Sequence, residues 1–391
     1  MYARTLTGLI PGIHVNLISL IVVSFSVILL KFISPITITV FIVSMAITHT
    51  FVDYIPSIFL GAPDEDSFLS ILPGHKLLLK GQAYFAIIFT LYGSLSALLI
   101  IILFTPIFIF ILPKIYPYIS RIMPLILILV SGYLILTEKN KKLFALIIFL
   151  LAGFLGIVSL NLNLNEPLIP LLTGLFGASN LIISIKQKIK IPNQQIIKLK
   201  KIPINKKSII KSGFAAIIAA PFTAFLPGLG ASQAALIGKE VSGDLNQKEF
   251  LCLLGAINTV VMGLSFIALY AINKTRTGTA VAISKIIETL SFSNLIIIIF
   301  TIIFSGIIAF FITLKISKII AKNISKFNYS KISIFILIIL IIITFYFTGI
   351  IGLLIFIISS FLGITAILLG IKRMHLMGCL LIPTIFFYLF P

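Results

Sequence analysis

Long apolar runs alternate with short polar connections along the whole chain. Runs such as 143–160 and 295–314 approach the roughly 20 residues that a helix needs to cross the hydrocarbon core of a bilayer. Closed β-barrels show short segments of alternating hydrophobicity instead, and no such segment occurs here. The pattern predicts an all-α integral membrane protein with about 10–12 transmembrane or re-entrant helices, lying in the cell membrane as a multi-pass protein.

The apolar elements fall into two halves of similar spacing. The first half holds elements near 7–30, 35–60, 82–112, 117–136, 143–160 and 166–184, and the second holds elements near 212–238, 250–272, 290–314, 331–349, 350–370 and 374–391. A shift that places Thr50 on Thr259 superposes the last five elements of each half. Spacing, rather than residue identity, indicates a duplication. We therefore predict a first membrane repeat at 1–185, a basic cytoplasmic linker at 186–211 and a second membrane repeat at 212–391.

Composition excludes the soluble classes. The chain is 60% hydrophobic and 10% charged, whereas a globular domain is about half apolar and a quarter charged. In a soluble protein, the net charge of +20 would indicate a nucleic-acid partner. Here the lysines stand between the apolar runs, where the positive-inside rule places them, so no nucleic-acid partner is expected.

The charges of corresponding loops are swapped between the halves. The loop 138–142 carries three lysines, whereas its counterpart 346–351 carries no charge. The loops on either side of that counterpart are basic instead, with Lys318 and Lys372 among their residues. Opposite loop charge implies opposite topology, which is typical of the inverted repeats of secondary transporters. Inversion needs an odd number of crossings, but the number of elements in each half is even. One element should therefore be re-entrant or broken, and the elements interrupted by Gly and Pro are the candidates.

Each half also contains a Pro-Gly break inside an apolar element, at 8–16 and at 225–233. Proline removes a backbone donor and glycine permits left-handed conformations, so a helix stops there. The next helix begins with free N–H groups, which form a ready site for an anion. The alternative is that each break is only a kink, as is common in membrane helices. The candidate substrate-binding residues are Pro11, Gly12, His14, Asn16, Pro227, Gly228, Gly230, Ser232 and Gln233, together with Asn258.

A second group of polar residues follows the element 35–60. Asp53 stands at the end of an apolar stretch, where ionisable residues are rare and usually functional. His49 precedes it by four residues, so both lie on one face of a helix. They form either a proton relay or ion-ligand pair, which is our ion-coupling candidate, or a polar pair satisfied by packing. The acidic residues 64–66 fit a solvated loop, and the counterpart of this region begins at Asn258.

These residues carry a family resemblance. The two Pro-Gly motifs, the stretch 53–63 (DYIPSIFLGAP) and the run 73–81, in which Pro-Gly-His-Lys precedes a glycine, resemble the TctA family. This is the large membrane subunit of tripartite tricarboxylate transporters. The resemblance implies a carboxylate permease that works with a small membrane subunit and an extracytoplasmic binding protein. His14 replaces a glycine of the family motif, and the acidic 64–66 replaces small residues, so the chain resembles a divergent, archaeal branch.

We therefore predict a secondary-transporter-like permease for a small organic anion, coupled to H⁺ or Na⁺, with the anion between the two Pro-Gly breaks. No cofactor or metal is expected. A translocase for a polyprenyl phosphate lipid is the alternative, because paired intramembrane Pro-Gly breaks also occur in proteins that handle phosphorylated lipids. An intramembrane enzyme is disfavoured. The sequence has no Gly-x-Ser-x-Gly motif with a partner histidine, and its four histidines show no metal-binding spacing.

Overall fold

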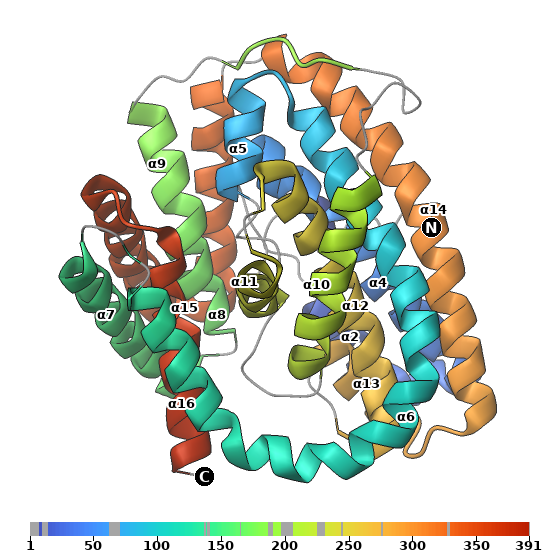
Figure 1. The fold of residues 1–391 in the computed structure, drawn as a ribbon. Coiled ribbons are helices and arrows are strands. Elements are labelled where there is room, and N and C mark those ends of the chain that lie inside the picture. The colour runs from blue at the N-terminus through green and yellow to red at the C-terminus, as the bar shows by residue number, and fades with distance from the viewer. Residues whose placement is uncertain are drawn as a thin grey trace.

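A computed structural model describes residues 8–9, 15–61, 71–136, 138, 141–164, 166–186, 191–196, 206–224, 231–243, 245–274, 277–326 and 329–390. Every regular element in these ranges is a helix, and no strand occurs in them. The predicted all-α class is confirmed (Figure 1).

The helices follow one another in this order. The first half contains α2 (Val15–Ser24), α3 (Ser26–Leu29), α4 (Pro35–Val52), the π-helix η1 (Pro56–Leu60), α5 (Ile71–Leu79), α6 (Ala83–Leu136), α7 (Lys142–Asn161), α8 (Leu168–Leu172), the π-helix η3 (Thr173–Ala178) and α9 (Ser179–Lys186). The second half contains α10 (Lys206–Ala224), α11 (Ala231–Ser242), α12 (Gln247–Ile272), α13 (Gly278–Ile286), α14 (Phe292–Asn323), the 3₁₀-helix η5 (Ile324–Lys326), α15 (Tyr329–Leu369), the 3₁₀-helix η6 (Arg373–Met377) and α16 (Gly378–Leu389).

Seven of the described helices are long and apolar enough to cross a membrane. They are Pro35–Leu60, Ala83–Tyr118, Lys142–Asn161, Leu168–Lys186, Gln247–Ile272, Phe292–Lys326 and Ser330–Leu369. Their outer faces carry large hydrophobic side chains such as Phe304 and Tyr346, which are 62% and 80% exposed. An apolar surface of this kind is costly in water but matches lipid tails. The chain is therefore a multi-pass integral membrane protein.

Two pairs of predicted elements are joined in the structure. The elements expected near 82–112 and 117–136 form one helix, α6, which contains Pro106, Pro113, Pro117 and Pro124. Each proline removes a helical hydrogen bond without ending the helix, so α6 bends along the lower edge of the molecule (Figure 1). The elements expected near 331–349 and 350–370 are both part of α15. Its break is at Gly349, where φ is 62° and ψ is −157°, a conformation open to glycine alone.

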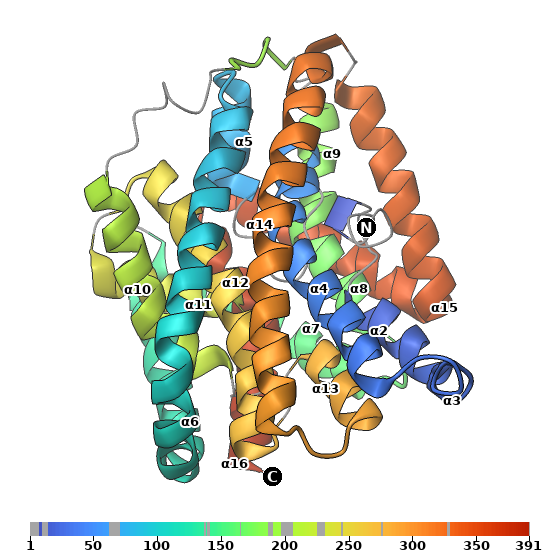
Figure 2. The ribbon, with the colours of Figure 1, turned by 90° about the vertical axis from the view of Figure 1, so that its right-hand side faces the viewer.

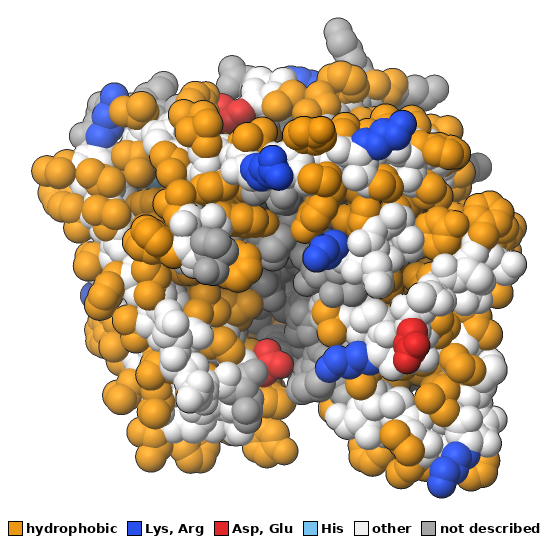
Figure 3. Space-filling view, turned by 90° about the horizontal axis from the view of Figure 1, so that it is seen from below, with side chains coloured by type: hydrophobic (Ala, Val, Ile, Leu, Met, Phe, Trp, Pro, Cys, Tyr) orange, Lys and Arg blue, Asp and Glu red, His pale blue; other side chains and the backbone are white. Residues whose placement is uncertain are grey.

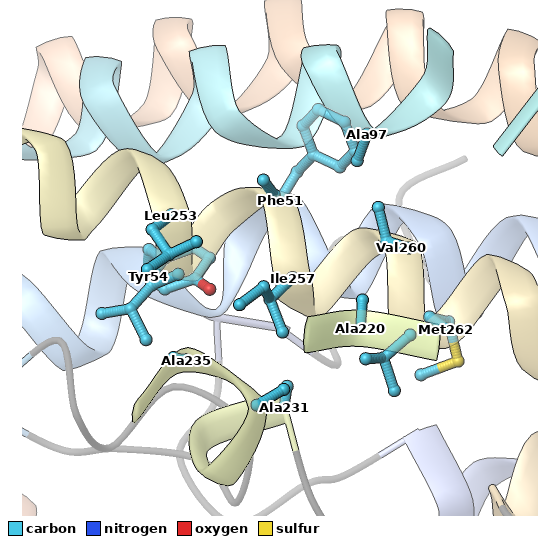
Figure 4. Packing of buried hydrophobic residues seen from close by; sticks show 14 of the residues in the cluster. Phe51, Tyr54, Ala97, Ala220, Ala231, Ala235, Leu253, Ile257, Val260 and Met262 are labelled. Carbon is cyan, nitrogen blue, oxygen red and sulfur yellow. The ribbon is translucent and has the colours of Figure 1, made fainter. Parts of the chain in front are cut away.

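Helix α12 is the centre of the molecule. Of its most apolar stretch, 94% is buried inside the protein, and α4, α6, α10 and α11 pack around it. Figure 4 shows side chains of these helices, among them Phe51, Tyr54, Ala97 and Ala231, gathered around Leu253, Ile257 and Val260 of α12. A helix that is apolar on every side and surrounded by protein keeps a polar side chain away from both lipid and water.

Helices α6 and α12 approach backbone to backbone. A Cβ atom on Gly255 of α12 would lie 2.0 Å from the carbonyl oxygen of Thr90, and one on Gly93 of α6 would lie 1.9 Å from the carbonyl oxygen of Cys252. The hydroxyl of Ser94 donates to the carbonyl oxygen of Gly255 at 3.1 Å. Small residues at helix contacts permit such an approach inside a membrane, where the hydrophobic effect does not drive helices together.

The helices form two groups with a hollow between them. On one side, α4 packs against α14 and α6 packs against α12; on the other, α16 packs against α7, and α15 packs against α9 and η3. Figure 1 shows these groups to the right and left of α11. Seen from below, the molecule is hollowed between the groups, and hydrophobic side chains cover much of the surface around the hollow (Figure 3).

The described part of the basic linker is bound to the turn before α6. The side chain of Gln194 accepts a hydrogen bond from the backbone N–H of Ala83 at 2.9 Å and donates to the carbonyl oxygen of Leu78 at 3.1 Å. The N–H of Gln195 donates to the carbonyl oxygen of Gly81 at 2.7 Å. The linker and the α5–α6 turn therefore lie at the same end of the molecule, the upper end in Figure 1.

Candidate functional site

A buried carboxylate lies where the two halves of the chain meet. Asp53 follows the last residue of α4 and is 1% exposed, and Asn258 in the middle of α12 is 2% exposed. The amide Nδ2 of Asn258 donates to Oδ2 of Asp53 at 3.0 Å. A buried charge is tolerated only when hydrogen bonds replace its hydration, and Asn258 provides one of them. The structure thus joins two of the predicted site residues, one from each half.

A second polar contact lies beside the first. The hydroxyls of Thr50 on α4 and Thr259 on α12 are 3.1 Å apart, and Thr50 also donates to the carbonyl oxygen of Ile47 at 2.9 Å. Because a threonine hydroxyl carries one proton, Thr259 is the donor in the contact between the two threonines. Both side chains are fully buried. These contacts fix how α4 and α12 cross.

His49 lies on the same buried part of α4. It is 3% exposed, and its carbonyl oxygen accepts the N–H of Asp53 at 3.0 Å, which continues the helix by one residue. The predicted pair His49 and Asp53 is therefore inside the protein rather than on its lipid-facing surface. A hydrogen bond joins the Asp53 carboxylate to Asn258 on α12.

The chain after Asp53 widens into the π-helix η1. Pro56 has no N–H to donate to the carbonyl of Val52, so the regular α-helical pattern is lost there. The hydroxyl of Ser57 then donates to the carbonyl oxygen of Asp53 at 3.1 Å. Single π-helical turns are rare and occur frequently at functional sites. The predicted stretch 53–63 therefore begins with a locally irregular and buried helix.

Helix α5, which carries the first seven residues of the motif 73–81, packs directly on η1. A Cβ atom on Gly74 would lie 2.6 Å from Cγ1 of Ile58. Burial lowers the pKa of the neighbouring His75 to about 4, and the positive charge of Arg373 acts in the same direction. His75 is thus a neutral imidazole at physiological pH, and it lies within electrostatic range of Arg373 from the far end of the chain.

Arg373 is a buried cation bound to the second π-helix. The side chain is 6% exposed. Its Nη2 donates to the carbonyl oxygens of Leu175 and Phe176 at 3.1 and 2.7 Å and to the hydroxyl of Ser179 at 3.1 Å. Its guanidinium carbon is 5.4 Å from the centre of the Phe176 ring, close enough for a cation–π contact.

Sequence comparison places these features in a known family. The model of the Tripartite tricarboxylate transporter TctA family matches residues 2–378. The chain belongs to the TctA family. It is similar to the uncharacterized protein MJ1079 of Methanocaldococcus jannaschii, with 32% identity over 393 residues, 98% of this chain and 96% of that protein. No solved structure matches the chain. The resemblance to the family, and to an archaeal branch of it, is confirmed.

The two Pro-Gly breaks of this TctA protein fall outside the described residues. This applies to Pro11, Gly12, His14, Pro227, Gly228 and Gly230, and also to the acidic residues 64–66. Helix α10 ends at Ala224, and new helices begin directly after each break, α2 at Val15 and α11 at Ala231. Asn16 is in the first turn of α2, and Ser232 and Gln233 are in the first turn of α11; the structure describes their backbones. Helix α2 contacts α4, and α11 contacts α12.

Two residues that lie within electrostatic range of each other in this TctA protein are not among the site residues predicted from the sequence. In the sequence, His75 is part of a motif and Arg373 stands beside Lys372. The sequence does contain an indication for Arg373, because this residue directly precedes the apolar run 374–391, and charged residues at such positions are costly in a membrane.

The described residues contain no group of three or more His, Cys, Asp or Glu side chains that could hold a metal ion.

Proposed function

We propose that this TctA-family protein is a secondary transporter for a small organic anion with carboxylate groups, coupled to H⁺ or Na⁺. The observation that carries the proposal is the buried Asp53–Asn258 hydrogen bond between α4 and α12. An ionisable residue inside a membrane protein is expensive to maintain and is usually functional. Asp53 contacts the most buried helix of the molecule and lies next to the family's motif, so its position suits a coupling site.

We propose further that the halves, 1–185 and 212–391, are inverted repeats joined by the cytoplasmic linker 186–211. Under the shift of 209 residues, α4 corresponds to α12 and α6 to α14. In a two-fold arrangement, a contact between two elements implies the same contact between their counterparts. The contact α4–α14 then corresponds to α12–α6, and both exist. In Figure 2, α6 begins at the top beside α5, whereas α14 begins at the bottom beside α13, which supports opposite orientations.

The remaining helices support the same relation. Helix α7 corresponds to the part of α15 after Gly349, and the segment from α8 to α9 corresponds to α16. The packing of α7 against α16 has its counterpart in the packing of α15 against α8, η3 and α9. In a two-fold arrangement, a residue can contact its own counterpart only if both lie near the symmetry axis. Thr50 and Thr259 are counterparts under the shift of 209 residues, and their hydroxyls are 3.1 Å apart.

The anion is proposed to bind between the two Pro-Gly breaks. Its ligands would be backbone donors at the breaks and the side chains of His14, Asn16, Ser232 and Gln233. Helices α2 and α11 start directly after the breaks, and a helix N-terminus favours an anion by about 0.3–1 kcal/mol when exposed and up to about 2 kcal/mol when partly buried. Two such ends would give modest affinity, which permits release on the other side of the membrane.

Coupling is proposed to act through Asp53, with His49 as its neighbour on α4. Protonation of Asp53, or Na⁺ bound to it, would remove a buried negative charge that otherwise repels the anionic substrate. Filling the cation site would therefore raise affinity for the carboxylate, which is the thermodynamic requirement for co-transport. Family membership also points to partners, a small membrane subunit and an extracytoplasmic binding protein.

Uptake into proteoliposomes tests the proposal. We expect radiolabelled citrate to accumulate when an inward H⁺ or Na⁺ gradient is imposed, and Asp53→Asn to abolish gradient-driven accumulation while the protein still inserts. Glu288→Gln is the matched control, because Glu288 is an exposed acid between α13 and α14. If wild-type protein accumulates no di- or tricarboxylate under either gradient but moves a polyprenyl phosphate across the bilayer, the proposal is wrong and the lipid translocase is right.

A further inference from the structure

The guanidinium of Arg373 is buried without a negative partner among the described residues. Its hydrogen bonds go to two backbone carbonyls and one hydroxyl, all of them neutral. Glu138 is the described carboxylate bound to this segment, and it accepts instead from His375 at 2.9 Å and from the N–H of Lys372 at 3.4 Å. Since burying an uncompensated charge is strongly unfavourable, the fold keeps this cation at a cost that a structural role alone does not explain.

Arg373 and residues beside η3 carry further buried donors that lack acceptors among the described residues. Its Nε is buried and has no hydrogen-bond partner. The same is true of Nδ2 of Asn180, the residue after Ser179, and of the hydroxyl of Ser359, whose Cβ would lie 2.5 Å from a Cβ added to Gly174 of η3. A buried donor without an acceptor costs about 1–3 kcal/mol. An anion with several oxygens would match this region, because its oxygens can accept from the donors beside the π-helix and its charge can balance that of Arg373.

The location connects this group to the family's motif. Arg373 acts electrostatically on His75 of α5, α5 packs on η1, and η1 follows Asp53 closely along the chain. Helix α15, which carries Ser359, contacts η1 as well as η3. Helix α15 therefore joins the two π-helices, and packed elements connect Asp53 to Arg373.

We propose that Arg373 binds a carboxylate group of the transported anion, as the cationic part of the substrate site. A planar guanidinium is suited to this task because its N–H groups match the two oxygens of a carboxylate. In the described conformation Nη2 is held by η3, which fixes the plane of the group and leaves Nε as a donor for the ligand. The inference rests on the proposed function, since it assigns a binding role within carboxylate transport.

The first experiment measures citrate uptake by Arg373→Gln and Arg373→Lys. We expect the apparent KM of Arg373→Gln to rise at least about tenfold and that of Arg373→Lys to rise less, because lysine keeps the charge but loses the planar donor pair. Arg121→Gln is the matched control, because it removes an exposed arginine of the same charge; it should not change KM by more than about twofold.

A second measurement does not depend on the folding of a variant. Phenylglyoxal modification of wild-type protein, mapped by mass spectrometry, should be slowed at Arg373 by citrate and unchanged at Arg121. An unchanged KM in Arg373→Gln, or modification of Arg373 that citrate does not slow, would overturn the inference. A further variant would combine Arg373→Gln with neutral residues at 64–66. Recovery of uptake in this variant would also overturn the inference, because the negative partner of Arg373 would then be these acidic residues and not the substrate. Absence of wild-type uptake of any carboxylate would instead refute the proposed function.

Discussion

The side-chain hydroxyls of Thr50 and Thr259 lie 3.1 Å apart, although the two residues are separated by 209 positions in the chain. This is the same separation that aligns the apolar elements of the two halves. Shortly after Thr50, at the end of α4, Asp53 accepts from Asn258, the residue before Thr259. The contact between the two threonines thus marks the crossing of α4 and α12, and the buried carboxylate lies beside it.

The inverted-repeat proposal predicts from which face of the membrane a reagent can reach each of two corresponding residues. Lys80, before α6, corresponds to Thr289, before α14, and both are exposed. Inversion would place them on opposite faces of the membrane. We would replace the buried cysteines Cys252 and Cys379 by alanine and introduce single cysteines at these two positions. The introduced cysteines should react with an impermeant maleimide from opposite sides. Lys80→Cys should react from the cytoplasmic side, like Lys318→Cys. Labelling of Lys80→Cys and Thr289→Cys from one side would refute the inversion.

The close contact between α6 and α12 predicts that one methyl group added at Gly255 lowers the stability of the protein. In Gly255→Ala, the added Cβ would lie 2.0 Å from the carbonyl oxygen of Thr90, so the helices must separate. We expect a loss of about 1–3 kcal/mol in stability, as for other overpacked cores, seen as a lower melting temperature in detergent. Gly132→Ala is the control, because nothing lies within 4 Å of its added Cβ. Equal melting temperatures for the two variants would contradict the close approach.

The carboxylate of Glu138 predicts a pH-dependent contribution to stability. Burial raises its pKa, but hydrogen bonds from His375 and from the N–H of Lys372, with the positive charge of Lys372, outweigh burial and lower the pKa below its ordinary value. A lowered pKa stabilises the folded state above the ordinary value of about 4.3, and this contribution disappears as the pH falls through the lowered pKa.

Glu138→Gln should therefore melt at a lower temperature than wild type at pH 7, by an amount on the order of 1 kcal/mol. The difference should shrink as the pH falls below about 4. Glu288→Gln, at an exposed glutamate, should show no such pH-dependent gap. A difference in melting temperature between Glu138→Gln and wild type that stays constant down to the lowest pH would show that the hydrogen bond between Glu138 and His375 does not contribute in this way.

The second Pro-Gly break predicts a selective loss of transport. Gly228→Leu should block the approach of the substrate to the backbone and abolish citrate uptake, while the protein still inserts and folds. Asn16→Ala and Gln233→Ala should raise the apparent KM more mildly, because each removes one side-chain ligand. Normal uptake by Gly228→Leu, in protein of wild-type yield, would favour the simple kink over a binding site.

The sequence by itself determined the helical class, the membrane location and the family. Hydropathy is a local property, so runs such as 143–160 predict their helices without any knowledge of the neighbours, and α7 is found at Lys142–Asn161. The ends of the elements were predicted less well. Two elements were expected near 82–112 and 117–136, but a helix can bend at proline without ending, and α6 continues to Leu136.

Only the tertiary structure decided which polar groups meet. Asp53 and Asn258 were both recognisable as candidates, yet their partnership depends on how α4 crosses α12. The electrostatic influence of Arg373 on His75 was not predicted, because nothing in the local sequence encodes a spatial relation across about 300 residues. Periodicity and hydropathy report whether a residue faces protein, lipid or water. The pairing of buried groups instead follows from the packing of whole helices, which the chain specifies only when all of them are in place.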